Sequence, residues 1–130
     1  MISITSKSPY ALAALVELQL HGGTDPVPIA ELARRREIPV QFLEQLFAAL
    51  RRAGVLRSQR GVGGGYSFGR PPSDVTVLEV VELLDGPLGQ DANGVFAEAA
   101  EAARAVLAAY TIAKMADAEA RAAGAHMYHI

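Results

Sequence analysis

Apolar residues near the start of the chain recur with the spacing of an amphipathic helix. They are Leu12, Leu15, Val16 and Leu18. Residues three or four apart share one face of a helix, so the pattern predicts a first helix with one buried side. Ser8 and Pro9 fit an N-cap followed by proline at the first helical position, and His21-Gly22-Gly23 fits the end of this helix.

Two further helices are predicted across a tight break. Pro28 opens a short second helix, whose arginines at 34–36 we expect in solvent. That helix must end at Ile38-Pro39, because proline disfavours helical geometry in the residue before it. A third, amphipathic helix is predicted from residue 39 or 40 to about residue 53. Two short helices joined in this way are the components of a helix-turn-helix.

The next segment has the composition of a β-hairpin. Residues 55–59 and 66–68 favour strands, and the tip between them, residues 60–65, is rich in glycine. Glycine tolerates positive φ, so the tip can turn sharply. A helix-turn-helix followed directly by a hairpin is the winged variety, and we expect a mainly α fold with a small β-hairpin wing.

The second half of the chain is predicted to be helical. Thr76 and Glu79 have the spacing of a capping box, and Gly86-Pro87 ends the helix that they open. Residues 95 to about 123 are rich in alanine without proline or glycine, which predicts one long helix. A small domain cannot cover that length, so we expect a dimerisation helix that pairs with a second copy. The alternative is that this helix folds back over its own winged domain.

The net charge of −2 hides an asymmetry. Residues 1–70 hold nine basic and five acidic side chains, whereas residues 71–130 hold three basic and nine acidic ones. A basic front and an acidic back indicate that only the front meets a polyanion such as double-stranded DNA. Scattered charges on ordinary helices are the alternative explanation.

These patterns predict three regions. They are a winged helix-turn-helix DNA-binding domain over 1–72, a capped helix, loop and dimerisation helix over 73–123, and a C-terminal tail over 124–130. No leader peptide and no run of about 18 apolar residues is found, so we expect a cytoplasmic protein without a membrane partner. The absence of cysteine excludes disulfides, thiol nucleophiles and thiolate metal sites.

Three linked motifs identify a resemblance. They are FLEQLF at 42–47, LRRAGVL at 50–56 and RGVGGGY at 60–66, with Ser6-Lys7 and Tyr10-Ala11-Leu12 before them. In this order they closely resemble the IscR/NsrR/CymR family of bacterial winged-helix transcription regulators. The resemblance implies a homodimer whose third helix enters the major groove of DNA while the wing tip reaches the adjacent minor groove.

The resemblance also implies the residues that contact DNA. Implied base readers are Gln41, Glu44 and Gln45, and implied phosphate contacts are Lys7, Tyr10, Arg51 and Ser58. Glutamine can pair with adenine, and glutamate can accept from the amine of cytosine. Arg60 is implied in the minor groove, where Gly61, Gly64 and Gly65 let the backbone approach.

One departure from the family changes the expected chemistry. Most relatives place three cysteines after the capped helix to bind an iron–sulfur cluster, and residues 86–102 here contain none. Asp91, Asn93 and Glu98 lie nearby but lack the thiolate softness that a cluster needs. We therefore expect no cofactor and no metal site. Ser8-Pro9, where relatives have glycine and a basic residue, also argues against a phosphate clamp there.

The chain stops at a tail that resembles the cysteine-free, CymR-like branch, in which the regulator binds O-acetylserine sulfhydrylase. Tyr128, His129 and Ile130 are the implied partner-binding residues, since a terminal isoleucine offers a free carboxylate and a branched apolar side chain. The expected function is therefore a repressor that reports on cysteine supply. Packing of the tail against the dimer, or a disordered tail, is the alternative.

Two other functions stay open, and an enzyme is not expected. The three histidines lack partners at triad-like spacing, and the glycine-rich tip lacks the lysine and hydroxyl of a phosphate-binding loop. One open alternative is a regulator that senses a small metabolite between the capped helix and the long helix. The other is a protein-interaction module that has lost DNA binding.

Overall fold

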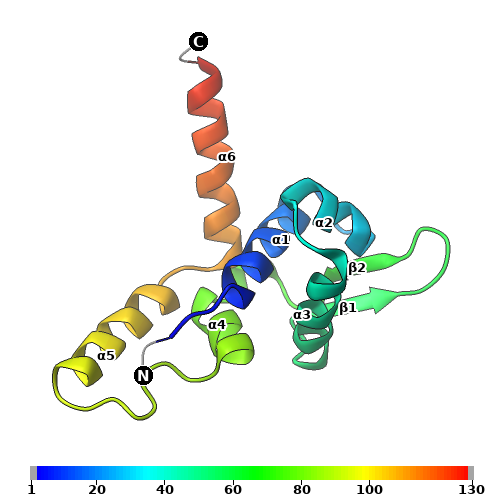
Figure 1. Cartoon of the computed structure of the whole chain (residues 1–130). Coiled ribbons are helices and arrows are strands. Elements are labelled where there is room, and N and C mark those ends of the chain that lie inside the picture. The colour runs from blue at the N-terminus through cyan, green and yellow to red at the C-terminus, as the bar shows by residue number, and fades with distance from the viewer. Residues whose placement is uncertain (1–2, 129–130) are drawn as a thin grey trace.

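The computed structural model describes residues 3–128, and the side-chain environments of residues 3–124 (Figure 1). In chain order the elements are α1 (Lys7–His21), α2 (Ile29–Arg36), α3 (Val40–Arg52), β1 (Leu56–Gln59), β2 (Gly65–Phe68), the 3-10 turn η1 (Pro72–Asp74), α4 (Val77–Asp85), α5 (Val95–Ala108) and α6 (Ile112–Tyr128). Within these residues, no helix combines the length and the apolar character needed to cross a membrane.

A three-residue turn joins α2 to α3, as the sequence predicts. Glu37 ends α2 in the left-handed region at φ 55°, which is uncommon for a residue other than glycine. Ile38 is buried and donates its backbone N–H to the carbonyl of Ala33 at 2.9 Å. Pro39 then precedes the first residue of α3. The helix-turn-helix is therefore held by a buried apolar anchor as well as by its backbone.

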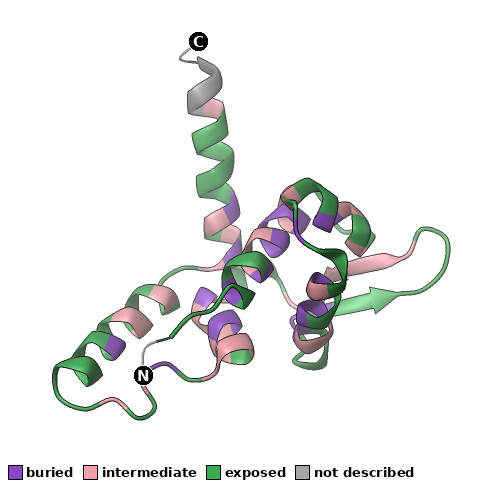
Figure 2. Ribbon diagram, in the orientation of Figure 1, coloured by how far each residue is buried: buried purple, intermediate pink, exposed green. Residues whose placement is uncertain are grey.

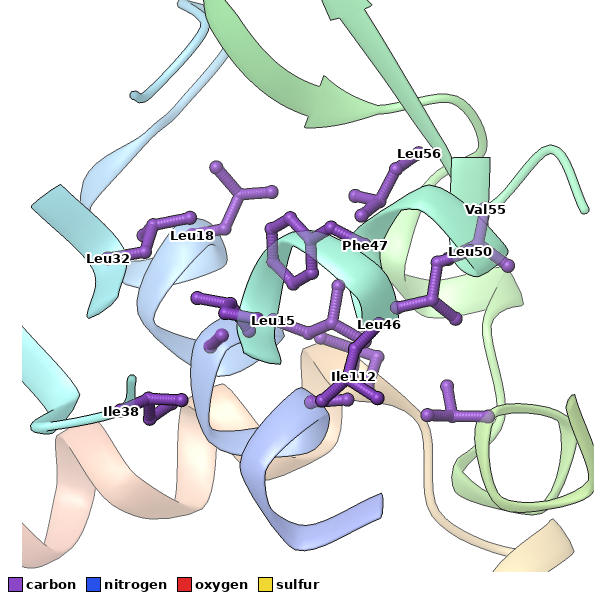
Figure 3. Close-up of a cluster of buried hydrophobic side chains, with 14 of the residues drawn as sticks. Leu15, Leu18, Leu32, Ile38, Leu46, Phe47, Leu50, Val55, Leu56 and Ile112 are labelled. Atoms are coloured by element: carbon purple, nitrogen blue, oxygen red, sulfur yellow. The ribbon is translucent and has the colours of Figure 1, made fainter. Parts of the chain in front are cut away.

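The main apolar core joins the helix-turn-helix to α1, the wing, α4 and the start of α6 (Figure 3). Leu15 on α1, Phe47 on α3 and Ile112 on α6 are each fully buried in it. Burial of a large apolar side chain contributes about 1.5–3 kcal/mol, so these positions fix how the helices meet. Figure 2 shows the buried residues gathered where these helices cross, whereas much of α6 is exposed.

The wing is a two-stranded antiparallel hairpin in which Leu56 lies opposite Phe68 and Gln59 opposite Gly65. Val27, just before α2, adds a bridge to β2 by exchanging two backbone hydrogen bonds with Tyr66 at 2.8 and 2.9 Å. The bridge ties the wing to the helix-turn-helix. The wing tip extends beyond the body of the protein (Figure 1).

The start of α4 confirms the predicted cap, with one change of partner. Thr76 Oγ1 accepts a hydrogen bond from the backbone N–H of Glu79 at 3.1 Å. The Glu79 side chain pairs with Arg70 and so fixes α4 to the segment that follows the wing. Gly86 ends the helix at φ 86°.

The prediction of a single helix from residue 95 to about 123 is wrong. The chain leaves the helix at Ala109, and α5 and α6 diverge from that point (Figure 1). Tyr110 accepts from the N–H of Val77 at 2.9 Å, and Ile112 donates to Val75 at 3.0 Å. Thr111 then caps α6 by accepting from Lys114 N–H at 3.1 Å. These long-range bonds interrupt the helix without glycine or proline.

The predicted N-cap at Ser8 is also wrong. Helix α1 begins two residues earlier than predicted, at Lys7, and Ser6 in the N-cap position provides no side-chain cap. Ser8 is fully buried and donates its hydroxyl to Asp85 Oδ2 at 2.5 Å. Asp85 also accepts from the backbone N–H of Thr5 at 3.2 Å. A carboxylate at the end of α4 therefore replaces the local cap and favours the positive end of the α1 dipole.

Candidate nucleic-acid interface

Helix α3 has one buried and one exposed polar face. Leu43, Leu46, Phe47 and Leu50 are buried against the core. Gln41, Glu44 and Gln45 are exposed on the other side. The structure therefore brings the three predicted base readers together on one solvent-facing surface of the second helix of the helix-turn-helix. A helix presented in this way has the dimensions to enter the major groove of B-DNA.

The start of α1 lies beside this surface. The ring of Tyr10 meets the ring of Phe42 edge-on at 5.7 Å between centroids. Lys7 and Gln45 both line a shallow cavity of about 230 Å³ between α1, α3 and α4. Two of the predicted phosphate contacts thus border the predicted base readers, which is how backbone contacts fix the register of a reading helix.

The remaining predicted residues lie on the hairpin and at the end of α3. Ser58 is exposed on β1, opposite Tyr66, and Arg60 is exposed at the start of the tip. Arg51 lies in the last turn of α3, also exposed. DNA contact at both α3 and the wing tip would therefore involve two separate surfaces of the chain.

Two of the three predicted wing glycines are explained by the fold itself. A Cβ on Gly64 would lie 2.2 Å from the carbonyl oxygen of Gln59, and one on Gly65 would lie 2.3 Å from that of Val27. Both positions therefore require glycine whether or not DNA is bound. Gly61 is different, since a Cβ there would meet open space although φ is 93°.

Eight of the nine basic side chains of residues 1–70 fall into two sets, and the ninth, Arg70, pairs with Glu79. Those of α2 are paired, because Arg34 and Arg35 contact Glu31 at 2.6 and 2.9 Å and Arg36 contacts Glu17 at 2.8 Å. The second set makes no ion pair with any residue of the described part of the chain; we call it the unpaired cationic set. Its members are Lys7, Arg51, Arg52, Arg57 and Arg60.

The expectation that the α2 arginines lie in solvent is confirmed for Arg34 and Arg35, which are exposed, whereas Arg36 is partly buried. The sequence did not predict that all three pair with carboxylates. Glu17 on α1 is only 6% exposed and binds both Arg35 and Arg36, while Arg36 also reaches Glu119 on α6 at 2.9 Å. Burial alone would raise the pKa of Glu17. Hydrogen bonds from Arg36 and Arg35 and the charge of His21 lower this pKa by more than burial raises it, so it lies below the usual range. A glutamate inside the apolar run 15–18 was the sequence signal for this network.

The pairing decides which cations remain for a polyanion. An arginine already bound to carboxylates gains less from a phosphate, because the existing pair must break first. Residues of the unpaired cationic set can bind a phosphate without breaking an existing ion pair. Within residues 1–70, the cations without carboxylate partners therefore lie on α1, α3 and the wing, and those of α2 hold the fold together. Lys114 and Arg121 on α6 also make no ion pair with the described residues, but they lie far from α3 in the sequence.

The chain is similar to known bacterial transcription regulators. Vibrio atlanticus IscR is 43% identical over 84 residues, which are 65% of this chain and 49% of that protein, so the chain spans about half the length of such relatives. T. potens IscR superposes with a TM-score of 0.80 at 32% identity, covering 91% of this chain and 88% of that one. CymR, the global cysteine regulator of B. subtilis, superposes with a TM-score of 0.81 at 28% identity, covering 90% and 98%.

These neighbours are winged-helix regulators, and the fold of this chain is the same. Residues 4–118 match the Rrf2 family, which is described as an iron-dependent transcriptional regulator. The chain belongs to the Rrf2 family of transcriptional regulators.

Proposed function

We propose that this regulator is a homodimeric repressor that binds a two-fold symmetric operator, with α3 in the major groove and the wing in the adjacent minor groove. The observation that carries the proposal is the exposed polar face of α3, bordered by members of the unpaired cationic set. Gln41 and Gln45 can bond to adenine, and Glu44 can accept from cytosine. Lys7, Tyr10, Arg51 and Ser58 contact phosphates and fix the register.

The wing adds a second reading surface. Arg60 enters the minor groove, where a narrow A·T-rich segment has enhanced negative potential that attracts a guanidinium. Gly61, Gly64 and Gly65 keep the tip slim enough to follow it. DNA contact by both a helix and a hairpin is consistent with members of the unpaired cationic set on α3 and on the wing.

A second copy of the chain completes the proposed repressor. Residues 117–123 of α6 are all exposed, and an isolated helix of this length is marginally stable in water. Val95, Phe96 and Val106 on α5 are also exposed, at 69, 68 and 58%. Pairing around a two-fold axis buries such surfaces and places two α3 helices at the spacing of two half-sites.

The residues present do not fit an iron–sulfur cluster. The sequence has no cysteine, and Asp91, Asn93 and Glu98 in the α4–α5 region are all exposed oxygen ligands. Within the described residues, no three histidine or carboxylate side chains lie close enough to hold a metal ion. The proposed repressor therefore responds to a signal other than an iron–sulfur cluster.

That signal, in our proposal, is cysteine supply, received through O-acetylserine sulfhydrylase. The proposal is supported by the likeness to CymR, which is named a global cysteine regulator, and by the missing cluster ligands. The implied contact residues Tyr128, His129 and Ile130 lie outside the side chains that the structure describes.

DNA binding is tested by selecting duplexes from a randomised pool with the purified full-length protein. Fluorescence anisotropy then gives the affinity of a selected duplex, and sedimentation gives the mass of the complex. We expect an enriched inverted repeat bound by two chains, with affinity that falls steeply between 50 and 200 mM salt, roughly in line with several phosphate contacts. No enrichment, or salt-independent binding, would contradict the proposal.

The partner is tested by calorimetric titration of O-acetylserine sulfhydrylase from the same organism. Full-length protein and a version lacking residues 128–130 are compared. Binding that requires these residues supports the cysteine-supply proposal, and no binding by either version removes it while leaving the DNA-binding proposal intact.

A further inference from the structure

The wing tip is a well-defined turn with a single apolar residue at its apex. Gly64 donates its backbone N–H to the carbonyl of Gly61 at 3.0 Å and so closes a four-residue turn. Gly63 occupies the third position at φ 78°, as a type II turn requires. Val62 stands at the second position, and its side chain is presented outward by a closed turn.

Val62 contacts almost nothing in the chain. Its exposed fraction is 108%, whereas the next most exposed large apolar residue of the described chain, Val95, reaches 69%. Valine has one strongly preferred side-chain rotamer in many settings, so little freedom is lost when such a residue is buried by a partner. Covering a rigid, exposed apolar group with a partner surface lowers the free energy, because apolar surface is removed from water.

The charge around the turn specifies the partner. Residues 45–73 contain no acidic side chain, and Arg57, Arg60 and Arg70 lie in the hairpin or directly after it. Arg57 and Arg60 belong to the unpaired cationic set, and Arg60 is two residues from Val62. An apolar apex on a cationic stem fits a polyanion with apolar walls. The minor groove, lined by deoxyribose carbons between two phosphate chains, has that composition.

We propose that Val62 is a specificity-determining residue, which the wing inserts into the minor groove of the operator next to Arg60. This inference rests on the proposed DNA-binding function. The two methyl groups pack against deoxyribose and the floor of the groove. A·T and T·A pairs present only acceptors there, whereas a G·C pair adds the amino group of guanine. Val62 leaves that donor without a partner and so disfavours G·C where the wing sits.

The test uses Val62→Ala, Val62→Thr and Arg60→Ala in the full-length protein. The DNA probes are a duplex selected by the unmodified protein and a matched duplex with G·C in place of A·T in the minor-groove segments that flank the half-sites. Val62→Thr keeps the shape and adds a hydroxyl that can accept from guanine. Anisotropy is measured at several salt concentrations, and circular dichroism confirms folding.

We expect Val62→Ala to bind the selected duplex about fivefold to twentyfold more weakly, with an unchanged salt slope, because no phosphate contact is lost. Arg60→Ala should weaken binding and reduce the salt slope by about one if the arginine also neutralises a phosphate. Val62→Thr should reduce the difference in affinity between the selected duplex and the G·C-substituted duplex.

Affinities of both Val62 variants within about twofold of the unmodified protein on both duplexes would overturn the inference. The same holds if Val62→Ala changes only the mass of the protein in sedimentation, because the apex would then contact protein. Failure of the proposed function is a different result, since the unmodified protein itself would then select no duplex.

Discussion

Arg36 donates from Nε to the buried carboxylate of Glu17 at 2.8 Å. Its Nη2 also reaches Glu119 at 2.9 Å, so one guanidinium joins α2 of the helix-turn-helix to both α1 and α6. If α6 pairs two chains, this contact lies between the dimer interface and the DNA-reading unit. The orientation of the two reading helices then depends in part on a side chain that contacts neither DNA nor the second copy.

Glu17→Gln should destabilise the fold by about 2 kcal/mol, because it removes the buried negative charge that Arg35 and Arg36 bind. Urea unfolding followed by circular dichroism measures the change. The matched control is Glu31→Gln, which removes the more exposed carboxylate that binds Arg34 and Arg35, and it should have a much smaller effect. Equal losses in the two variants would show that burial of Glu17 is unimportant.

The same carboxylate makes stability depend on pH. The folded state holds the pKa of Glu17 below its usual range, since hydrogen bonds from Arg36 and Arg35 outweigh the effect of burial. The contribution of Glu17 to the free energy of unfolding is therefore complete above the pKa of a glutamate in the unfolded chain, about 4.3. This contribution is lost as pH falls through the lower pKa of Glu17 in the folded state. Glu17→Gln should flatten the acid limb of a plot of unfolding free energy against pH, and an unchanged limb would contradict this account.

Asp85→Asn tests the cap that α4 supplies to α1. Burial alone would raise the pKa of Asp85. Hydrogen bonds from Ser8 and Thr5 lower this pKa by more than burial raises it, so the carboxylate is ionised at neutral pH. We expect a loss of about 1–2 kcal/mol in thermal or urea unfolding. Ser8→Ala should cost a similar amount, and the double variant should cost less than the sum because the two residues share one interaction.

Gly65→Ala tests whether the wing glycines have a structural role. The added Cβ would lie 2.3 Å from the Val27 backbone, at φ 147°, so we expect a loss of more than about 2 kcal/mol or a failure to fold. Gly124→Ala is the control, because a Cβ there meets nothing within 4 Å inside α6. That change should stabilise by about 0.5–1 kcal/mol. A tolerated Gly65→Ala would leave DNA contact as the reason for that glycine.

Local chemistry was enough to predict the helix-turn-helix and the hairpin. Pro28, Pro39 and the glycines of the tip act within a few residues of their own position, and the predicted bounds agree with α2, α3 and the two strands. The break after α5 was missed for the opposite reason. It depends on backbone bonds from Tyr110 and Ile112 to residues 75–77, which are distant in the sequence.

The candidate interface was predictable only in part. Sequence spacing put Gln41, Glu44 and Gln45 on the polar side of a helix, and the structure shows them exposed there. The three consecutive arginines of α2 looked equivalent to those of α3 and the wing. Glu31 lies three and four residues from Arg34 and Arg35, so helical spacing could predict those pairs. Glu17 and Glu119 come from α1 and α6, so only the fold could show that Arg36 is paired.

The central claim is that DNA binds the unpaired cationic set, including the wing, and avoids the paired arginines of α2. Its most direct test compares Arg60→Ala with Arg34→Ala on one selected duplex at several salt concentrations. We predict that Arg60→Ala loses most of the specific affinity while folding normally, and that Arg34→Ala binds like the unmodified protein. Unchanged affinity and sequence preference in Arg60→Ala, or an equal loss in Arg34→Ala, would contradict the account.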